Sequence, residues 1–191
     1  MGTLTLLRHG QTTANASGLL QGRIDHPLDD IGRDQAAAAA AAIGPVDRVV
    51  SSPLVRARET AAAFAMEPEI DDRWIELDYG EWDGRPMADL PDGTWDRWRH
   101  DLDLRPPGGE TIRELAARVR AALESFLLGP QEHVVVVSHV SPIKAAVAWS
   151  LGVDDTVSWR TYLTTGSYSS IRLGGSTPVL TSFNVVPPTA S

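Results

Sequence analysis

The sequence contains no cysteine, which excludes disulfide bonds and thiolate nucleophiles and fits a reducing compartment. Basic residues are also few, because 17 Lys and Arg stand against 25 Asp and Glu and leave a formal charge of −8. A polyanion would meet a repulsive average field, so the composition argues against nucleic acid as a partner. Small anions can still bind wherever arginines are focused locally.

Long hydrophobic runs are missing as well. The opening "MGTLTLLRHG" has no basic leader, and no run elsewhere approaches the length that spans a bilayer. These absences predict a cytoplasmic protein with no membrane partner. With 191 residues, 42% of them hydrophobic and 22% charged, the chain is expected to form a single domain over residues 1–191 with a well-filled core.

Three short apolar runs are typical of strands that are buried on both faces, and each is followed by helix signals. The runs cover residues 3–7, 47–52 and 133–138. The first helix is expected to begin at Asp29 or Asp30 and to end near Gly44, and the second to run from Pro53 to about Met66. A third is expected to begin at the capping box of Thr111 and Glu114 and to stop at Gly129-Pro130. A fourth is expected after the last strand, with Ser141 as its cap and Pro142 as its first residue.

Strands that alternate with helices predict an α/β fold, a three-layer sandwich with a mostly parallel central sheet and helices on both faces. Two more strands around Gly174-Gly175 are expected to add an antiparallel edge, and this exposed edge allows a homodimer. Residues 185–191 are expected to form a loose tail.

Residues 83–109 are rich in Trp, Pro, Asp and Gly, which is typical of an irregular, lid-like insertion. One short helix is expected around residues 95–100. Trp82, Trp95 and Trp98 have two interpretations: an aromatic platform for a nucleotide or sugar, or simple packing, which is the commoner case. Trp149, on a predicted helix, is expected in the core.

Cationic and imidazole side chains follow all three predicted parallel strands. Arg8 and His9 follow the first, Arg56 lies in the first turn after the second, and His139 follows the third. Singly, Arg56 could be a solvated helix residue and His139 a cap or a core histidine. Because the ligand crevice of an open α/β sheet lies beyond the carboxyl ends of its strands, these side chains should meet there. Guanidinium forks, imidazoles and helix N-termini together favour a phosphoryl group.

Five segments, "LLRHGQTTAN", "SSPLVRARETA", "IELDYGEWDG", "PPGGE" and "VVSHVSPIK", resemble the histidine phosphatase superfamily with its phosphoglycerate mutase-like fold. The resemblance implies that His9 is the nucleophile and that Glu76 is the proton donor, although Asp78 and Glu81 lie close enough to contest this role. It also implies no metal and no cofactor. The residues that it implies for phosphate binding are Arg8, Asn15, Gln21, Gly22, Arg56, His139 and Val140, the last of these through its backbone N–H.

The sequence departs from the common family pattern after the second histidine, where Val140 replaces a glycine and can narrow the site. The expected activity is that of a metal-independent phosphomonoesterase acting on a small phosphorylated metabolite through a phosphohistidine, in the acid phosphatase and α-ribazole phosphatase-like branch. Two alternatives remain: a phosphoglycerate mutase-type phosphoryl transfer, and a phosphate-binding module with weak or no turnover.

Overall fold

The computed structural model describes residues 2–126 and 132–189. Its strands are β1 (Gly2–Arg8), β2 (Arg48–Ser51), β3 (Glu69–Ile70), β4 (His133–Ser138), β5 (Tyr168–Leu173) and β6 (Val179–Val185). Its α-helices are α1 (Thr13–Ala16), α2 (Asp30–Ile43), α3 (Val55–Ala61), α4 (Thr94–His100), α5 (Ile112–Glu124) and α6 (Val140–Leu151). Short 3-10 helices are η1 (Ala62–Phe64), η2 (Asp72–Trp74), η3 (Gly80–Trp82), η4 (Met87–Asp89) and η5 (Asp155–Arg160).

The strands of the described ranges form one mixed sheet in the order β3-β2-β4-β1-β5-β6. The first four strands of this order are parallel, and β5 and β6 add an antiparallel edge beside β1. In the parallel register Arg8 of β1 is opposite Ser138 of β4, while Ser51 of β2 is opposite Val137. The three central strands therefore end at one edge of the sheet, as the sequence predicts.

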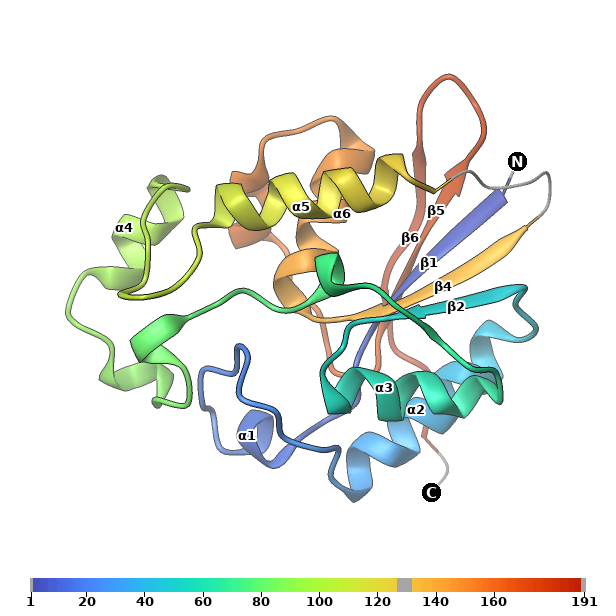
Figure 1. The fold of residues 1–191 in the computed structure, drawn as a ribbon, viewed down its shortest axis with the longest axis horizontal. Coiled ribbons are helices and arrows are strands. Elements are labelled where there is room, and N and C mark those ends of the chain that lie inside the picture. The colour runs from blue at the N-terminus through green and yellow to red at the C-terminus, as the bar shows by residue number, and fades with distance from the viewer. Residues whose placement is uncertain (1, 127–131, 190–191) are drawn as a thin grey trace.

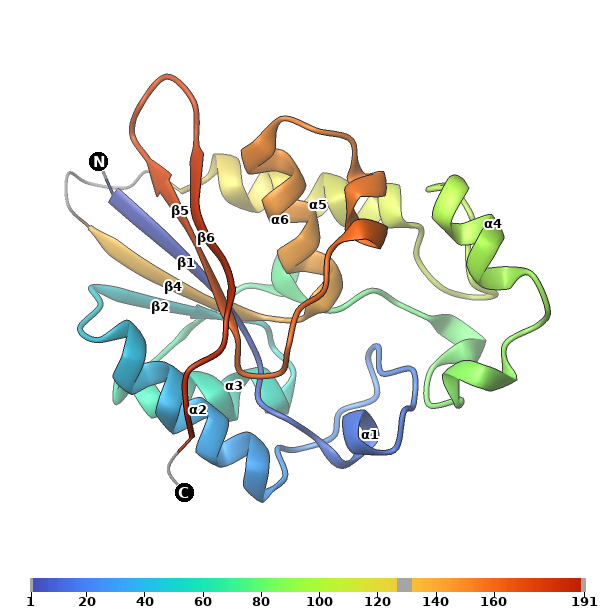
Figure 2. The same cartoon turned by 180° about the vertical axis from the view of Figure 1, so that it is seen from behind.

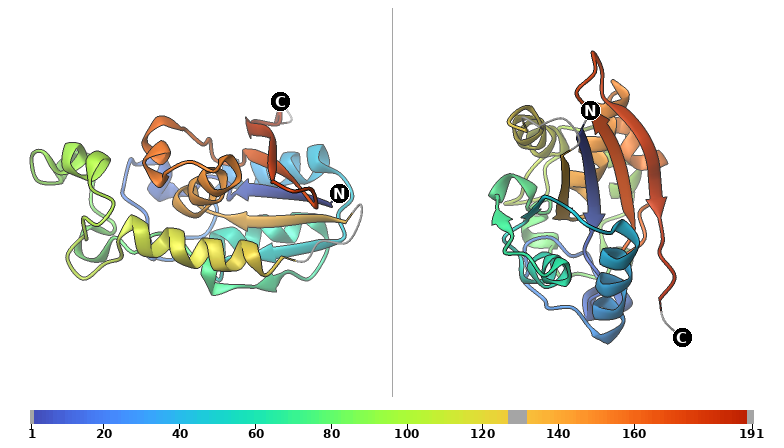
Figure 3. Two further views of the ribbon diagram at one scale, coloured as in Figure 1. Left: turned by 90° about the horizontal axis from the view of Figure 1, so that it is seen from above. Right: turned by 90° about the vertical axis from the view of Figure 1, so that its right-hand side faces the viewer.

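Helices cover both faces of this sheet, with α5 and α6 on one face and α2 and α3 on the other (Figures 1 and 2). The view from above and the end view show the same three layers (Figure 3). Alternate residues of β4 divide between the two cores, because Val134 and Val136 pack with α5 and α6 while Val135 and Val137 pack with α2 and α3. The α/β three-layer prediction is confirmed.

Two predicted helix starts are wrong. The second helix begins at Val55 rather than Pro53 and gives way to η1 after Ala61. The last helix is capped by His139 rather than Ser141, because the strand runs directly into it at Ser138. Pro142 falls in its first turn, where a missing N–H costs no intrahelical hydrogen bond.

The other predicted helices begin close to where the sequence predicts. Asp29 caps α2 by accepting from the Gly32 N–H, and Thr111 and Glu114 form the predicted capping box of α5. That helix ends at Glu124 with Ser125 as its C-cap, so the prediction that it continues to Gly129-Pro130 is wrong; those two residues themselves lie outside the described ranges. Strand β3 is an element that the sequence interpretation missed.

The two C-terminal strands form the predicted antiparallel edge. The predicted start of a loose tail at Val185 is wrong, because Val185 belongs to β6 and Pro187 beyond it is buried. The short helix expected around 95–100 is α4, which lies beyond the carboxyl ends of the strands together with α1 (Figure 1). In the described ranges, no helix has both the length and the apolar character needed to cross a membrane.

Candidate active site

His9 follows β1 directly and has the surroundings of a neutral nucleophile. Its Nδ1 lies 2.7 Å from the carbonyl oxygen of Gly10, and since a carbonyl can only accept, Nδ1 carries the proton. The Nε2 atom is therefore left with its lone pair. Burial, reinforced by the charges of Arg56 and Arg8, lowers the pKa of His9 well below its usual value. The ring is thus uncharged at neutral pH.

Gly10 fixes the path of the chain behind this histidine. A Cβ atom at Gly10 would lie 2.2 Å from the carbonyl oxygen of Gly32 in α2, so no larger residue fits. The Gly10 N–H donates to the hydroxyl of Thr60 in α3. The loop after His9 is consequently held against two helices on one side of the sheet.

His139 lies beside His9, with ring centroids 5.1 Å apart. It is fully buried, and its Nε2 lies 2.7 Å from the hydroxyl of Ser52 at the end of β2. Its Nδ1 has no hydrogen-bond partner among the described residues. Burial and the positive charge of Arg56 lower the pKa of His139 well below its usual value. Two neutral imidazoles therefore stand side by side at the end of β1 and β4.

Next to these rings Arg8 is half-buried and Arg56 is fully buried, and the loss of water around each guanidinium lowers its pKa. Within the described ranges neither guanidinium forms an ion pair with a carboxylate. Arg8 donates through Nη1 to the carbonyl of Leu163 at 2.6 Å. Buried cations without a carboxylate partner make this region attractive to an anion.

Arg56 also organises the loop that contains Gly22. Its two Nη atoms donate to the carbonyls of Gly22 and Ile24 at 2.6 and 3.0 Å. The amide groups of Gly22, Arg23 and Ile24 all donate to the carboxylate of Asp83. The loop is therefore clamped from both sides, and the Gly22 N–H is already used by the protein.

Asn15 and Gln21 are joined to Thr12. The Asn15 side chain closes the capping box of α1 with Thr12 and donates through Nδ2 to the Gln21 Oε1 at 3.1 Å. The Thr12 hydroxyl donates to the same oxygen at 2.9 Å. Gln21 Nε2 has no partner among the described residues, which leaves one buried amide donor unsatisfied.

Glu76 reaches the site from the loop after η2. It is 4% exposed, and its carboxylate accepts from the N–H of Leu77 at 2.7 Å and from the N–H of Ser141 at 3.3 Å. Ser141 lies in the first turn of α6, where the helix dipole favours a negative charge. Of the two competing acids, Asp78 is paired with Arg23 and Glu81 is exposed. Geometry therefore favours Glu76 over both.

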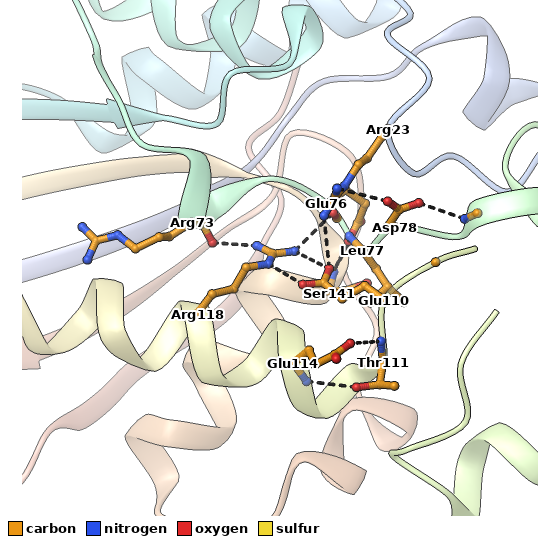
Figure 4. Close-up of polar contacts among 12 residues, drawn as sticks. Arg23, Arg73, Glu76, Leu77, Asp78, Glu110, Thr111, Glu114, Arg118 and Ser141 are labelled. Carbon is orange, nitrogen blue, oxygen red and sulfur yellow. Dashed lines mark hydrogen bonds and ion pairs between the residues drawn. The ribbon is translucent and has the colours of Figure 1, made fainter. Parts of the chain in front are cut away.

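Arg118 of α5 supports the Glu76 loop from behind (Figure 4). It donates to the carbonyls of Arg73 and Glu76 at 2.7 and 3.2 Å and makes two hydrogen bonds with the carboxylate of Glu110. Arg23 bridges Glu110 and Asp78 in turn. This network joins the Gly22 loop to the Glu76 loop. The sequence patterns did not predict it.

The Pro-Pro-Gly-Gly bend at residues 106–109 packs against the chain that follows Glu76. Gly80 has a positive φ of 53°, and a Cβ atom there would lie 2.1 Å from the carbonyl oxygen of Pro107. The N–H of Glu110 donates to the carbonyl of Asp78 at 2.9 Å. Close backbone contact between two distant motifs thus holds the loop that carries Glu76.

A cavity of about 660 Å³ opens at this edge of the sheet. The predicted site residues that line it are Arg8, His9, Asn15, Gln21, Glu76 and Val140. Gly22, Arg56 and His139 are not among its lining residues and stand behind them. Val140 is the first residue of α6, so its N–H has no acceptor within the helix.

The far wall of the cavity is aromatic. Trp98 is 1% exposed and contacts Tyr79, Trp82, Trp95 and Trp159, with ring centroids 5.5 to 5.9 Å apart. These contacts support the packing interpretation of the tryptophans, although Trp95 and Trp98 also line the cavity. Trp149, expected in the core, is only half-buried and packs against it.

Lys144, also in the cavity wall, was not singled out from the sequence. Two features of the sequence could have indicated it. Lys144 is the only lysine of the chain, and it stands one helical turn after Val140, a predicted phosphate-binding residue. Within the described ranges, no group of three or more His, Asp or Glu side chains is placed to hold a metal ion.

Comparisons with known proteins agree with this geometry. The family model of the histidine phosphatase superfamily (branch 1) matches residues 4–186, and the chain therefore belongs to that family. A bifunctional protein of Mycobacterium tuberculosis is 36% identical over 87% of this chain, which spans about half (49%) of that longer relative. A glucosyl-3-phosphoglycerate phosphatase of Mycolicibacterium vanbaalenii is 33% identical, with 91% of this chain and 84% of the relative covered.

Solved structures show the same similarity over nearly the whole chain. A mutant phosphoserine phosphatase from Entamoeba histolytica in complex with phosphoserine is 28% identical, with a TM-score of 0.88 and 97% and 98% of the two chains covered. A mycobacterial glucosyl-3-phosphoglycerate phosphatase in complex with VO3 is 31% identical, with a TM-score of 0.86 and 95% and 98% covered. The family and the fold implied by the five motifs are confirmed.

Proposed function

We propose that this chain is a phosphomonoesterase that hydrolyses a small phosphorylated metabolite through a phosphohistidine on His9. The observation that carries the proposal is the neutral ring of His9, which keeps its Nε2 lone pair in a cavity that also contains the Arg8 guanidinium and the Glu76 carboxyl group. A nucleophile, a cation and an acid in one cavity are the groups that phosphoryl transfer requires.

In the first step His9 Nε2 attacks phosphorus, and the bond between phosphorus and the leaving oxygen breaks. The Glu76 carboxyl group gives its proton to that oxygen, which leaves as an alcohol. In the second step a water molecule attacks the phosphohistidine while the Glu76 carboxylate accepts its proton. The phosphorus–nitrogen bond breaks, inorganic phosphate forms and His9 returns to its neutral state.

Unpaired buried polar atoms near the two histidines support an oxyanion site. Buried atoms without a hydrogen-bond partner among the described residues include Arg8 Nε, Gln21 Nε2, Arg56 Nε and His139 Nδ1. Buried polar atoms are normally paired, so the unpaired donors of the cavity-lining residues Arg8 and Gln21 favour an acceptor from outside the protein. Phosphoryl oxygens supply acceptors, and the local positive charge stabilises the charge spread in the transition state.

The finer assignment to the histidine acid phosphatase type is part of the same proposal. A nucleophilic imidazole must be unprotonated, and the low pKa of His9 keeps it so in mildly acidic solution. The relatives named as glucosyl-3-phosphoglycerate phosphatase and phosphoserine phosphatase support a phosphomonoester as substrate.

The first test is release of inorganic phosphate from a chromogenic aryl phosphate. The second traps the chain during turnover and asks whether it carries a phosphoryl group that is stable in base and lost in acid. We expect both, with the phosphoryl group on the peptide that contains His9. In parallel, 3-phosphoglycerate with its bisphosphate primer should give phosphate and no isomerised product. Isomerisation would establish the mutase alternative, and phosphate binding without turnover would establish the binding module.

A further inference from the structure

The cavity contains a cation that the proposed phosphoryl chemistry does not use. Lys144 of α6 is half-buried in the cavity wall and donates from Nζ to the carbonyl of Ser158 at 2.8 Å. An ammonium group has three donors, so two remain without a protein acceptor among the described residues. Within the same ranges, no carboxylate forms an ion pair with it.

Lys144 lies in the same cavity wall as Glu76, the proposed proton donor to the leaving group. Lys144 stands three residues after Ser141 on the same helix face, and the Ser141 N–H contacts the Glu76 carboxylate. The acid that protonates the leaving oxygen must be within hydrogen-bond reach of it. The attacking and leaving atoms lie on opposite sides of phosphorus. A leaving group whose oxygen contacts Glu76 can therefore place its substituents near Lys144 in the same cavity.

The electrostatic surroundings of Lys144 agree with this placement. Burial lowers its pKa, while the negative charge of Glu76 raises it and the positive charge of Arg8 lowers it. The amine thus lies within electrostatic range of both the proposed acid and the proposed phosphate ligand. Glu76 acts on Lys144 only at longer range and forms no ion pair with it, so a half-buried cation in this position gains from a negative partner in direct contact.

Resting on the function proposed above, we propose that Lys144 forms a subsite for a carboxylate carried by the leaving group. A single ammonium balances a single negative charge, which suits a carboxylate better than a second phosphate with its larger charge and its need for several donors. The rest of the cavity, about 660 Å³ with an aromatic far wall, can hold further atoms attached to that carboxylate-bearing group.

The first test compares two substrates of one carbon skeleton, 3-phosphoglycerate and glycerol 3-phosphate, which differ by a carboxylate in place of a hydroxymethyl group. We expect Lys144→Met to reduce the ratio of their kcat/KM values about tenfold to a hundredfold, the effect of losing one hydrogen bond to a charged group. Lys144→Arg should retain more of the preference. Arg172→Met, which removes an exposed charge from β5, serves as the charge control. An unchanged ratio in Lys144→Met overturns the proposal.

The second test reads binding and does not depend on turnover. Because the chain has one lysine, reductive methylation modifies only Lys144 and the N-terminal amine. In a His9→Ala variant, 3-phosphoglycerate should slow modification of Lys144 more than glycerol 3-phosphate does, with the N-terminal amine as internal reference. Equal protection by both ligands overturns the carboxylate subsite. Loss of all aryl phosphate hydrolysis by the wild type would instead contradict the proposed function, and the protection result would still decide the subsite.

Discussion

The imidazole rings of His9 and His139 lie with their centroids 5.1 Å apart because the register of two parallel strands puts them there. Arg8 of β1 is opposite Ser138 of β4, and each histidine follows its strand by one residue. The His9 N–H donates to the carbonyl of Ser138 at 2.9 Å and continues the ladder by one bond. A slip of this register would separate the two imidazoles, so sheet pairing and the geometry of the proposed site depend on the same hydrogen bonds.

His9→Ala should abolish turnover while leaving the fold intact, because the variant removes the only proposed nucleophile and keeps the cations around it. We expect the rate of aryl phosphate hydrolysis to fall by about a thousandfold or more. Binding of inorganic phosphate, measured by calorimetry, should persist. His100→Gln, an exposed histidine of α4, is the matched control. Activity near the wild-type level in His9→Ala would contradict a phosphohistidine at this position.

Glu76→Gln should affect poor leaving groups more than good ones. An alkyl alcohol leaves only when protonated, whereas a nitrophenolate leaves readily as an anion. We expect kcat on an alkyl phosphate to fall by roughly a hundredfold or more, and kcat on a nitrophenyl phosphate to fall much less. Glu81→Gln, at an exposed carboxyl group of η3, is the control. A larger loss in Glu81→Gln, or in Asp78→Asn, would reassign the proton donor.

Arg118→Met should lower activity although Arg118 is absent from the cavity lining. The substitution removes the hydrogen bonds from Arg118 to the carbonyls of Arg73 and Glu76. It also removes the two hydrogen bonds from Arg118 to the partly buried carboxylate of Glu110. Displacement of an acid by about 1 Å can cost up to about a hundredfold. We expect kcat on alkyl phosphates to fall more than KM rises, which separates positioning from binding. Arg113→Met, on an exposed face of the same helix, is the control.

The free energy of unfolding should decrease as the solution is acidified below pH 6.5. His9 and His139 have lowered pKa values in the folded chain, while in the unfolded chain each titrates near 6.5. Below that pH the unfolded state binds more protons, so stability present above 6.5 is lost as the pH falls towards the folded pKa. Each ring contributes a slope of up to about 1.4 kcal/mol per pH unit.

Urea unfolding at several pH values, from about 7 down to 5, gives the free energy of unfolding at each pH. The slope of this free energy against pH checks the prediction, whatever the absolute stability. His139→Gln should flatten the slope by the share of one ring, even if its stability at pH 7 is lower through loss of the Ser52 contact. His100→Gln removes an exposed imidazole and provides the comparison. A His139→Gln slope equal to that of the wild type would show that burial does not suppress protonation of His139.

Local sequence patterns were sufficient to predict most elements. The apolar runs that became β1, β2 and β4 are dense enough to specify strands buried on both faces, and the capping residues of α2 and α5 make the predicted bonds. Strand β3 escaped prediction because it contains two exposed residues and gains its order from pairing with β2. The start of α6 was misplaced because Ser141, a good cap by type, lies in the first turn, where its N–H contacts Glu76.

The sequence by itself determined which chemical groups this protein brings to the carboxyl edge of its sheet, because Arg8, His9, Arg56 and His139 each follow or closely succeed a strand whose direction the crossover rule constrains. Only the tertiary structure decided how those groups are arranged. The burial of Arg56 and His139 behind the cavity wall, the Arg118 support of Glu76 and the placement of Lys144 against the Ser158 carbonyl all depend on contacts between separate segments of the chain. Such contacts leave no local periodicity, since their energy comes from strand register and packing between layers, which no short stretch of sequence specifies alone.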